Sequence, residues 1–304
     1  MKKNFFTSAI LVLAMSFMVG CSSDDSTPGN EVEDPKGQLF KQKILVEDIT
    51  SASCVWCPLA SFTTEELAKS EYDDRIISVA VHGDFNTQLV KDPFVLPGMT
   101  KLMSAVELGG WPFVAWNRDL DIKGTEFQGF IPKRKNESGE IQYTFDANLF
   151  KNFYTKYSLF SESSPIGIKI ESDLTVSGGK VDVSLKFGQD INQELKYVIY
   201  IIEDGLVFQQ ANASTLYGNN SGSARWEMNF VHNQVVRATN NFLGDPIAEG
   251  EAVTTNELKV SADLTYTVKN LENVSVVVAV LGEDGSVLNA QKSKANTTQD
   301  YEKL

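Results

Sequence analysis

Two cysteines separated by two residues carry the most recognisable chemistry in this sequence. An apolar, β-favouring run, Ile44–Val46, and then three small residues at 51–53 precede Cys54 and Cys57, and a helical pattern starts at Leu59. The pair is therefore expected at a strand-to-helix corner, on one face of the first helical turn. The helix N-terminus carries partial positive charge and free N–H groups, which favour a thiolate. Cys54 is expected to be the nucleophile, and Cys57 the thiol that resolves a mixed disulfide.

The same spacing admits two other interpretations. The cysteines could form a purely structural disulfide, or half of a zinc site. A zinc site would need two more ligands, and the sequence has no second cysteine pair and only two histidines, His82 and His232. We favour the redox pair and expect no metal. The sequence also has no phosphate-binding loop and no Ser/His/Asp spacing, so no cofactor is expected.

Length, charge and cysteine number narrow the class of protein. The chain has 304 residues and a formal net charge of −13, and this length fits two domains of roughly 100–150 residues each. The negative charge argues against nucleic acid as a partner. Of the three cysteines, only Cys21 lies outside the pair. Cys21 has a separate role, so no thiol is left over, as expected for an exported protein in an oxidising compartment.

The N-terminus has the pattern of a bacterial lipoprotein signal peptide. Residues 1–20 combine a basic start with the apolar run Phe5–Val19 and end at a Gly-Cys step that resembles a lipobox. We expect acylation of Cys21 and attachment to a membrane through this lipid anchor; an ordinary cleaved signal peptide is the alternative. Residues 21–38 are rich in Ser, Asp, Glu, Pro and Gly and are expected to form a flexible acidic tether. The acidic run resembles the surface-export signal of some Gram-negative lipoproteins, and a plain linker is an equal alternative.

Residues 39–162 alternate strand and helix signals. We expect strands at 44–50, 75–81 and 113–116, and helices between them at 59–70 and 99–108. A last helix is expected after Asp146, because aspartate is a preferred N-cap residue. The stretch between residues 127 and 143 fits either an insertion or a long hairpin.

The order of these elements resembles a thioredoxin-like domain. The Cys-x-x-Cys pair follows the first strand, and Pro112 begins a later one, where that family has a cis-proline facing the cysteines. The resemblance implies that Pro112 forms the opposite wall of a redox site, although a trans-proline at a strand start also fits the residues. Trp56 and Trp111 would then form an apolar rim for a substrate peptide. The pair departs from the family pattern because Val55-Trp56 replaces Gly-Pro.

Members of that family often bury an acid near the cysteines for proton transfer. Glu47 and Asp48 precede Cys54 by seven and six residues. Neighbouring residues of a strand point to opposite faces, so at most one of the two can take this role. A surface position is the simpler interpretation for either.

A change of hydrophobic period marks a boundary at Ser161–Pro165. After it, apolar residues alternate with period two, with turn signals between the runs and no long helical pattern. Residues 163–304 are therefore expected to form an antiparallel, Ig-like β-sandwich. The polar stretch Asn212–Arg225 is expected to be a long surface loop. The predicted fold class is thus an α/β thioredoxin-like domain, residues 39–162, followed by an all-β sandwich domain.

Four sequence segments in this second half, together with the signal peptide and the Cys-x-x-Cys-Pro motif, resemble another family. They lie at Tyr197–Gly205, Phe230–Ala238, Gly244–Ile247 and Val287–Gln291. Together they resemble outer-membrane lipoproteins related to the twenty-eight-kilodalton outer membrane protein, over nearly all of the mature chain. The resemblance implies a lipid-anchored protein of a Gram-negative outer membrane, facing the periplasm or exposed at the surface. It implies little about activity, because the family's biochemical role is poorly defined.

The two histidines are weaker candidates for chemistry. His232 lies in a stretch that also contains Arg237, where a binding site is one interpretation and a hydrogen-bonded histidine at a strand edge is the favoured one. His82 follows the strand at 75–81, and functional loops gather at such carboxyl ends in parallel sheets. We do not favour a catalytic role for His82, because nothing in the sequence pairs it with Cys54.

Two functions therefore follow from the sequence. The first is a membrane-anchored thiol–disulfide oxidoreductase that acts on a protein or peptide thiol through Cys54 and Cys57, with Pro112 opposite and Trp56 and Trp111 at the rim. The second is a non-catalytic surface binding or adhesion lipoprotein, in which the disulfide is a staple and the β-domain, or its Asn212–Arg225 loop, contacts the partner.

Overall fold

A computed structural model describes residues 37–157, 161–219, 223–248 and 250–304. The expected signal peptide, the acylation site at Cys21 and most of the acidic tether lie outside the described residues. Predictions about those segments are therefore not addressed by the fold.

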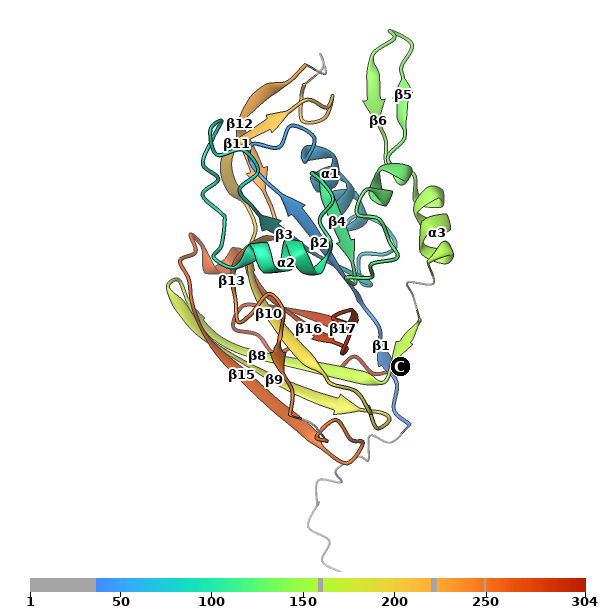
Figure 1. The fold of residues 1–304 in the computed structure, drawn as a ribbon, viewed down its shortest axis with the longest axis vertical. Coiled ribbons are helices and arrows are strands. Elements are labelled where there is room, and N and C mark those ends of the chain that lie inside the picture. The colour runs from blue at the N-terminus through green and yellow to red at the C-terminus, as the bar shows by residue number, and fades with distance from the viewer. Residues whose placement is uncertain (1–36, 158–160, 220–222, 249) are drawn as a thin grey trace, which may run out of the picture. The chain divides into compact units, whose positions relative to one another are not determined.

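The largest feature of the fold is one mixed β-sheet that uses strands from both halves of the chain (Figure 1). Its strands follow the order β17-β16-β10-β13-β3-β2-β4, and β14 pairs with β10. The pairs β2–β3 and β3–β13 are parallel, whereas the others are antiparallel. The strands span Ile44–Thr50 (β2), Ile76–His82 (β3), Phe113–Trp116 (β4), Lys196–Glu203 (β10), Val235–Thr239 (β13), Asp245–Pro246 (β14), Val274–Leu281 (β16) and Val287–Lys294 (β17).

The fold class predicted from the sequence is wrong. In the described residues, no α/β thioredoxin-like domain stands apart from a following sandwich, because β3 pairs directly with β13 at Ala80 and Val235. The described chain is mostly β, with few and short helices. The reason lies in β3, a strand that is buried along its whole length. Such a strand needs a hydrogen-bonded neighbour on each side, and its apolar sequence does not say which strands these are.

A smaller sheet packs against the second half of the large one. It contains β8 (Ile166–Thr175), β9 (Gly178–Phe187) and β15 (Glu257–Thr265), in the antiparallel order β15-β9-β8. Alternate residues of these strands meet alternate residues of β10 and β16 in one apolar core, as in a β-sandwich. The sandwich-like packing predicted for this half is therefore confirmed. Members of this core include Ile168, Ile170, Val183, Leu185, Ile199, Ile201, Val276 and Val278.

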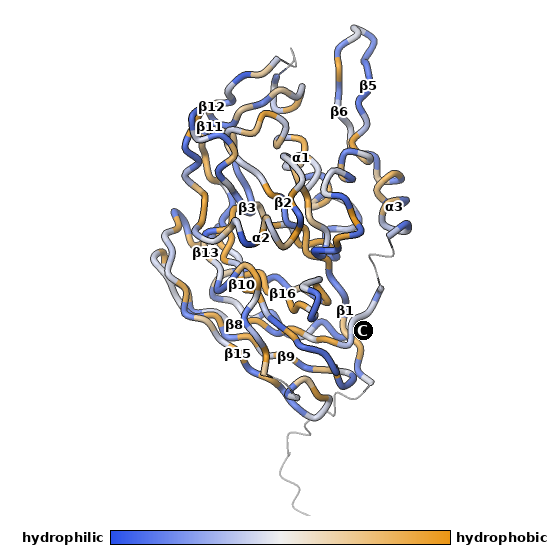
Figure 2. Tube along the Cα trace, viewed as in Figure 1, coloured by the Kyte–Doolittle hydropathy of each residue, from blue (hydrophilic) through white to orange (hydrophobic). Residues whose placement is uncertain are grey.

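Three helices cover the large sheet beyond the sandwich. The helix α2 (Met99–Ala105) belongs to a core that holds residues of β2 and β3 together with residues of β10 and β16. The helices α1 (Pro58–Leu67) and α3 (Ala147–Lys156) contribute to an aromatic-rich core with β2 and β4. Figure 2 shows hydrophobic residues running through the strands of these layers. The predicted N-cap of the last helix is confirmed, because the Asp146 side chain accepts hydrogen bonds from the Asn148 and Leu149 backbone.

Short elements complete the fold. Between β4 and α3 lie a 3₁₀ helix, η1 (Glu126–Phe130), and a polar hairpin of β5 (Lys133–Lys135) and β6 (Ile141–Tyr143). The stretch predicted as an insertion or a long hairpin thus contains a 3₁₀ helix and a short hairpin. A second 3₁₀ helix is η2, Leu271–Asn273. The remaining hairpin joins β11 (Leu206–Asn212) and β12 (Arg225–His232).

At the predicted boundary near Pro165, β1 (Phe40–Lys41) pairs with β7 (Ser163–Ser164). The division into segments 1–20, 21–38, 39–162 and 163–304 stays a prediction, as does independent folding of the last two. The described part of the Asn212–Arg225 stretch contains turns and no regular element between the two strands that flank it.

Candidate functional site

The Cys-x-x-Cys pair lies where the sequence predicted it, between a strand and a helix. Cys54 and Cys57 form a disulfide, with a Cα–Cα distance of 5.4 Å. Cys57 is the N-cap residue of α1, and Pro58 occupies the first turn, where the missing N–H costs little. Both cysteines are buried, with 2% of Cys54 and 0% of Cys57 exposed.

The β11 strand holds the cysteine loop from the C-terminal half of the chain. The Gln210 side-chain amide donates to the carbonyl oxygens of Ser51 and Cys54, at 3.1 and 3.0 Å. The backbone N–H groups of Ala211 and Ala213 donate to the carbonyls of Ala52 and Val55, both at 2.8 Å. Sequence reasoning missed this contact, because it joins residues more than 150 positions apart. The loop is therefore fixed by a strand that was predicted to belong to another domain.

Pro112 and the two tryptophans come together beside the disulfide. The Trp111–Pro112 peptide bond is cis. A pocket of about 430 Å³ is lined by Trp56, Trp111 and Pro112, with Leu59, Gln128, Ile131, Lys133 and Tyr143. The sequence placed these three residues around one site, and the structure places them in one pocket. Their roles in binding or catalysis stay predictions.

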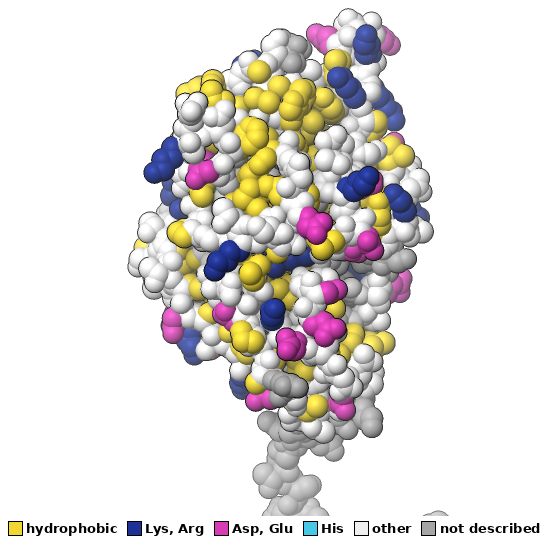
Figure 3. Space-filling model, in the orientation of Figure 1, with side chains coloured by type: hydrophobic (Ala, Val, Ile, Leu, Met, Phe, Trp, Pro, Cys, Tyr) yellow, Lys and Arg dark blue, Asp and Glu magenta, His cyan; other side chains and the backbone are white. Residues whose placement is uncertain are grey.

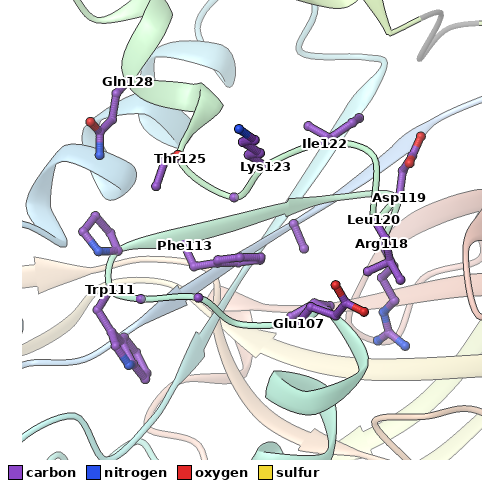
Figure 4. Close-up of a pocket in the computed structure, with 16 residues that line it drawn as sticks. Glu107, Trp111, Phe113, Arg118, Asp119, Leu120, Ile122, Lys123, Thr125 and Gln128 are labelled. Atoms are coloured by element: carbon purple, nitrogen blue, oxygen red, sulfur yellow. The ribbon is translucent and has the colours of Figure 1, made fainter.

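A second pocket adjoins the first along β4. It has a volume of about 380 Å³, and it shares Trp111, Pro112 and Gln128 with the other pocket. Figure 4 shows Trp111 and Phe113 on one side of it, with Lys123, Thr125 and Gln128 across from them. The two pockets thus meet at the cis-proline.

Apolar side chains surround this area on the surface. Trp56 is 42% exposed and Phe85 is 46% exposed. The Phe85 and Trp111 rings contact each other, with centroids 5.6 Å apart. Gly83 lies beneath them, and a Cβ there would lie 2.6 Å from the Trp111 ring, so the neighbouring side chains would have to shift. Figure 3 shows hydrophobic side chains gathered on the upper part of this face, beside the β5–β6 hairpin.

Glu47 and Asp48, the two acids considered from the sequence, are both buried. The prediction of surface positions is therefore wrong for both. The Glu47 carboxylate accepts two hydrogen bonds from the Arg118 guanidinium, at 2.8 and 2.9 Å, and one from the Tyr200 hydroxyl at 2.7 Å. Arg118 also donates to the Phe242 carbonyl at 2.8 Å. Burial opposes the charge of Arg118, but Glu47 and Tyr200 hold its pKa above the ordinary value.

Asp48 points to the opposite face of β2, and in the described part of the chain no ion pair joins it to a cation. Burial raises its pKa to about 8, although a hydrogen bond with Ser61 acts in the other direction. The Ser61 hydroxyl also lies 3.5 Å from the Cys57 backbone carbonyl oxygen, so Ser61 contacts both Asp48 and the backbone of the cysteine loop. Asp48 is thus neutral near pH 7 and is the buried acid nearest in sequence to Cys54.

The histidines, which the sequence left as separate weak candidates, meet in the structure. Their ring centroids are 5.3 Å apart. His82 Nδ1 lies 2.8 Å from Asp92 Oδ2, and that carboxylate also accepts from the Ala52 and Phe94 backbone. Burial acts to raise the pKa of Asp92, but His82 and the backbone donors together lower it. Burial, and then His82, lower the pKa of His232 to about 3.

Sequence reasoning had no signal for Asp92 as a partner of His82. Arg237, which shares a sequence stretch with His232, pairs instead with Glu203 at 3.3 Å. Among the residues that the structure describes, no group of His, Cys, Asp or Glu side chains is placed to hold a metal ion. None of the described helices combines the length and apolar character needed to cross a membrane.

The geometry defines a mostly β protein with a disulfide at a strand-to-helix corner and a two-part pocket beside it. The family model for outer membrane protein Omp28 matches residues 101–299, and the chain belongs to this family. The matched range begins after the cysteine pair and includes Trp111 and Pro112. A comparison with curated protein sequences found no match.

One solved structure shows a similar fold in another protein. HBP35 of Porphyromonas gingivalis is similar with a TM-score of 0.58 and 14% sequence identity, over 85% of this chain and 76% of that one. At this identity the likeness concerns the fold alone. A beta-glucosidase from Kluyveromyces marxianus matches with a TM-score of only 0.23 and 14% identity, over 59% of this chain and 21% of that one, and carries no argument.

Proposed function

We propose that this outer membrane protein family member exchanges disulfides with a protein or peptide thiol through Cys54 and Cys57. The observation that carries the proposal is the disulfide at the N-terminus of α1, beside a pocket lined by Trp56, Trp111 and Pro112. The helix N-terminus stabilises a thiolate that forms there. The apolar pocket walls suit the side chains of an extended peptide.

In the oxidised form, the reaction runs from the substrate to the protein. A substrate thiolate attacks Cys54 Sγ, and the Cys54–Cys57 bond breaks as a mixed disulfide forms. Cys57 leaves as a thiolate and takes up a proton. A second substrate thiolate then attacks the substrate sulfur of the mixed disulfide and releases the Cys54 thiolate. Two electrons pass from the substrate dithiol, which becomes a disulfide, to the cysteine pair.

Asp48 is the group we assign to supply the proton. It is neutral near pH 7 because burial raises its pKa to about 8, and Ser61 links it to the Cys57 end of the loop. A neutral carboxyl group can give its proton to the leaving thiolate, and it regains one when the cycle reverses. Glu47 cannot take this role, because its carboxylate is occupied by Arg118 and Tyr200 on the other face of the strand.

The test uses the purified mature protein and a peptide that contains two cysteines. Oxidised wild-type protein is expected to oxidise the peptide, and Cys54→Ser to abolish the transfer. Cys57→Ser, in which Cys54 is a lone thiol, is instead incubated with the disulfide form of the peptide. The Cys54 thiolate is expected to attack that disulfide, release the other peptide sulfur as a thiolate and leave a mixed disulfide visible by mass spectrometry. Trp56→Ala should slow the transfer about tenfold, which is about 1.4 kcal/mol of binding, and the matched control Trp226→Ala, an exposed tryptophan outside both pockets, should not. No transfer by the wild-type protein in any redox buffer would overturn the proposal.

A second candidate function is favoured by one observation, the burial of the disulfide. Neither cysteine is more than 2% exposed, and β11 holds the loop through Gln210 and two backbone hydrogen bonds. A substrate can reach Cys54 only after the segments of the protein that cover this residue move. In this candidate the disulfide is a staple in a non-catalytic surface binding protein. The reduction potential separates the two, because structural disulfides have values below about −300 mV and exchanging ones have higher values.

We further propose that Cys21 is acylated and anchors the protein to the outer membrane. The support is the apolar run that ends at Gly20-Cys21 and the acidic tether that follows. Mass spectrometry of the membrane fraction should find a diacylglyceryl-modified Cys21 peptide. Protease treatment of intact cells would then tell a surface-exposed chain from one that faces the periplasm. A soluble chain with an unmodified N-terminus would contradict the anchor.

A further inference from the structure

Three buried polar side chains surround a very small cavity behind the cysteine loop. The cavity has a volume of about 20 Å³ and is bounded by β2, β3, β12 and α1. Asp48, His82 and His232 line it, together with Thr50, Ser61, Thr64, Glu65, Ala80, Phe230, Val231, Asn233 and Gln234. A space of this size admits one water molecule, which needs roughly 10–15 Å³ by the same measure.

Each of the three side chains has one atom without a partner among the described residues. These atoms are Asp48 Oδ1, His82 Nε2 and His232 Nε2. Asp48 and His82 are each 2% exposed and His232 is 5% exposed, so bulk water does not satisfy them. Buried polar atoms normally have a hydrogen-bond partner, because leaving one unpaired costs free energy. Three such atoms on one small cavity point to a shared ligand.

The protonation of the three groups fixes what this ligand must donate and accept. His82 Nδ1 lies within hydrogen-bonding distance of the Asp92 carboxylate, which is an acceptor, and in the tautomer with its proton on Nδ1 the His82 Nε2 accepts. His232 bonds the Phe208 backbone carbonyl, and because Nε2 is its orphan atom, Nδ1 is the donor there and Nε2 is again an acceptor. A neutral Asp48 carries an O–H that donates. The ligand therefore donates two hydrogen bonds and accepts one.

We propose that this cavity binds one water molecule, which donates to His82 Nε2 and His232 Nε2 and accepts from the protonated carboxyl of Asp48. Water matches the required donors, acceptor and volume at once. Two imidazoles and a carboxylate are also ligands that zinc uses. Among the described residues, however, no such group is arranged to hold a metal ion.

The water joins Asp48 to a second buried acid near the cysteines. The path runs from Asp48 through the water to His82 and on to Asp92, whose carboxylate also accepts from the Ala52 N–H, two residues before Cys54. The two histidines hold the water, and the water positions the proton of Asp48. This role of the histidines rests on the proposed function. They are positioning residues, because neither contacts the cysteines in the described structure.

Other titratable groups face the same cavity, so they also contribute to its pH dependence. Glu65 of α1 lines it, and burial raises the pKa of that carboxyl. The Tyr217 hydroxyl donates to Glu65 at 3.1 Å. From β3 and β12 the facing groups are His82 and His232, and behind His82 lies Asp92.

Nuclear magnetic resonance of the oxidised mature protein tests the water site without an activity assay. The sequence contains only two histidines, so two sets of imidazole ¹⁵N signals report on the cavity. The water site requires the ring proton of each histidine on Nδ1, so both Nε2 signals are expected to show an accepted hydrogen bond. Asp48→Asn should shift both Nε2 signals, whereas Asp84→Asn, at an exposed position just after β3, should leave them unchanged.

Two further readouts keep the proposal open to refutation if Asp48→Asn is unstable. In the wild-type protein, a nuclear Overhauser contact between a long-lived water and the histidine rings is expected, as is a carboxyl ¹³C titration of Asp48 above pH 7. Histidine rings protonated on Nε2, or stoichiometric zinc binding that moves both Nε2 signals, would overturn the water site. If these measurements support the water site while the peptide oxidation assay shows no transfer, the water site stands and the proposed function fails. The two proposals can therefore fail separately.

Discussion

Two adjacent acids on one strand have opposite environments in this protein. Glu47 faces the core shared with β10, where Arg118 and Tyr200 bind both of its carboxylate oxygens. Asp48 faces α1, where it meets Ser61 and the water-sized cavity but no cation. Both are buried. The difference shows that burial alone does not set the charge of an acid; the neighbours on its face of the sheet do.

The two environments serve different purposes. The Glu47 site joins distant parts of the chain, because Arg118 follows β4 whereas Tyr200 and Phe242 belong to the second half. Arg118 accepts a left-handed backbone, φ 54°, to reach it, a conformation that costs about 1 kcal/mol for a residue with a Cβ. The Asp48 site instead places a carboxyl group of raised pKa beside Ser61 and the small cavity.

The largest expected change in the free energy of unfolding follows from removal of the cation at the Glu47 site. Arg118→Met leaves Glu47 buried without its counter-charge, and breaking a buried ion pair in this way typically costs about 3–5 kcal/mol. Urea denaturation of the mature protein measures the loss. The control is Lys69→Met, which breaks the exposed Glu66–Lys69 pair and should cost at most about 0.5 kcal/mol. A loss below about 1 kcal/mol for Arg118→Met would contradict the comparison.

A smaller change at the same site tests its hydrogen bonds. Tyr200→Phe keeps the ring but removes the hydroxyl that donates to Glu47 and accepts from Arg118. Hydrogen bonds to charged groups are worth about 1.5–3 kcal/mol, so a loss of about 2 kcal/mol is expected. Tyr197→Phe, on the other face of the same strand, serves as the control. Equal losses in the two variants would show that the buried hydroxyl of Tyr200 contributes nothing specific.

The Asp48 site should appear as a fall in stability at mildly alkaline pH. The pKa of Asp48 is about 8 in the folded chain and near 3.8 when unfolded, so the folded state holds more protons between these values and stability falls as pH rises. His232 has its pKa lowered to about 3, so its contribution rises with pH only below about 6.5. Between pH 6.5 and 8, Asp48 therefore dominates this pair.

From pH 6.5 to 8, the free energy of unfolding should drop by about 1–2 kcal/mol, since the slope is at most about 1.4 kcal/mol per pH unit for one proton. Asp48→Asn, which is neutral at every pH, should remove this drop. Glu71→Gln, at an exposed position, should keep it. The same drop in Asp48→Asn as in the wild-type protein would assign it to another group.

The smallest expected effect concerns the contact between β11 and the cysteine loop. Gln210→Ala removes the side-chain donor to the Ser51 and Cys54 carbonyls and should cost about 1 kcal/mol. Amide hydrogen exchange should quicken at Ala211 and Ala213, whose N–H groups donate to the same loop. Gln209→Ala, at the half-exposed neighbouring position, is the control. Unchanged exchange at both alanines would show that the loop does not depend on Gln210.

Local patterns in the sequence predicted many elements with nearly correct bounds. The strand predicted at 113–116 is β4, and the strand at 44–50 is β2. The cysteine pair sits at the predicted strand-to-helix corner, and Asp146 caps α3. The later strands were less complete. The segment that contains β13 and the end of β12 was recognised only for its family resemblance, and no strand was predicted over most of β15. These signals are read within one turn or one strand, so they do not depend on distant contacts.

The sequence by itself therefore determined many of the strands and helices, the cysteine corner and the sandwich-like second half. Only the tertiary structure decided that β3 pairs with β13, that Arg118 and Tyr200 meet Glu47, and that the histidines meet around one cavity. The physical reason is that local dihedral preference and hydrophobic period are encoded residue by residue. Pairing between distant strands depends on shape and on which buried edges remain free, and several apolar strands of similar composition satisfy the same local pattern equally well.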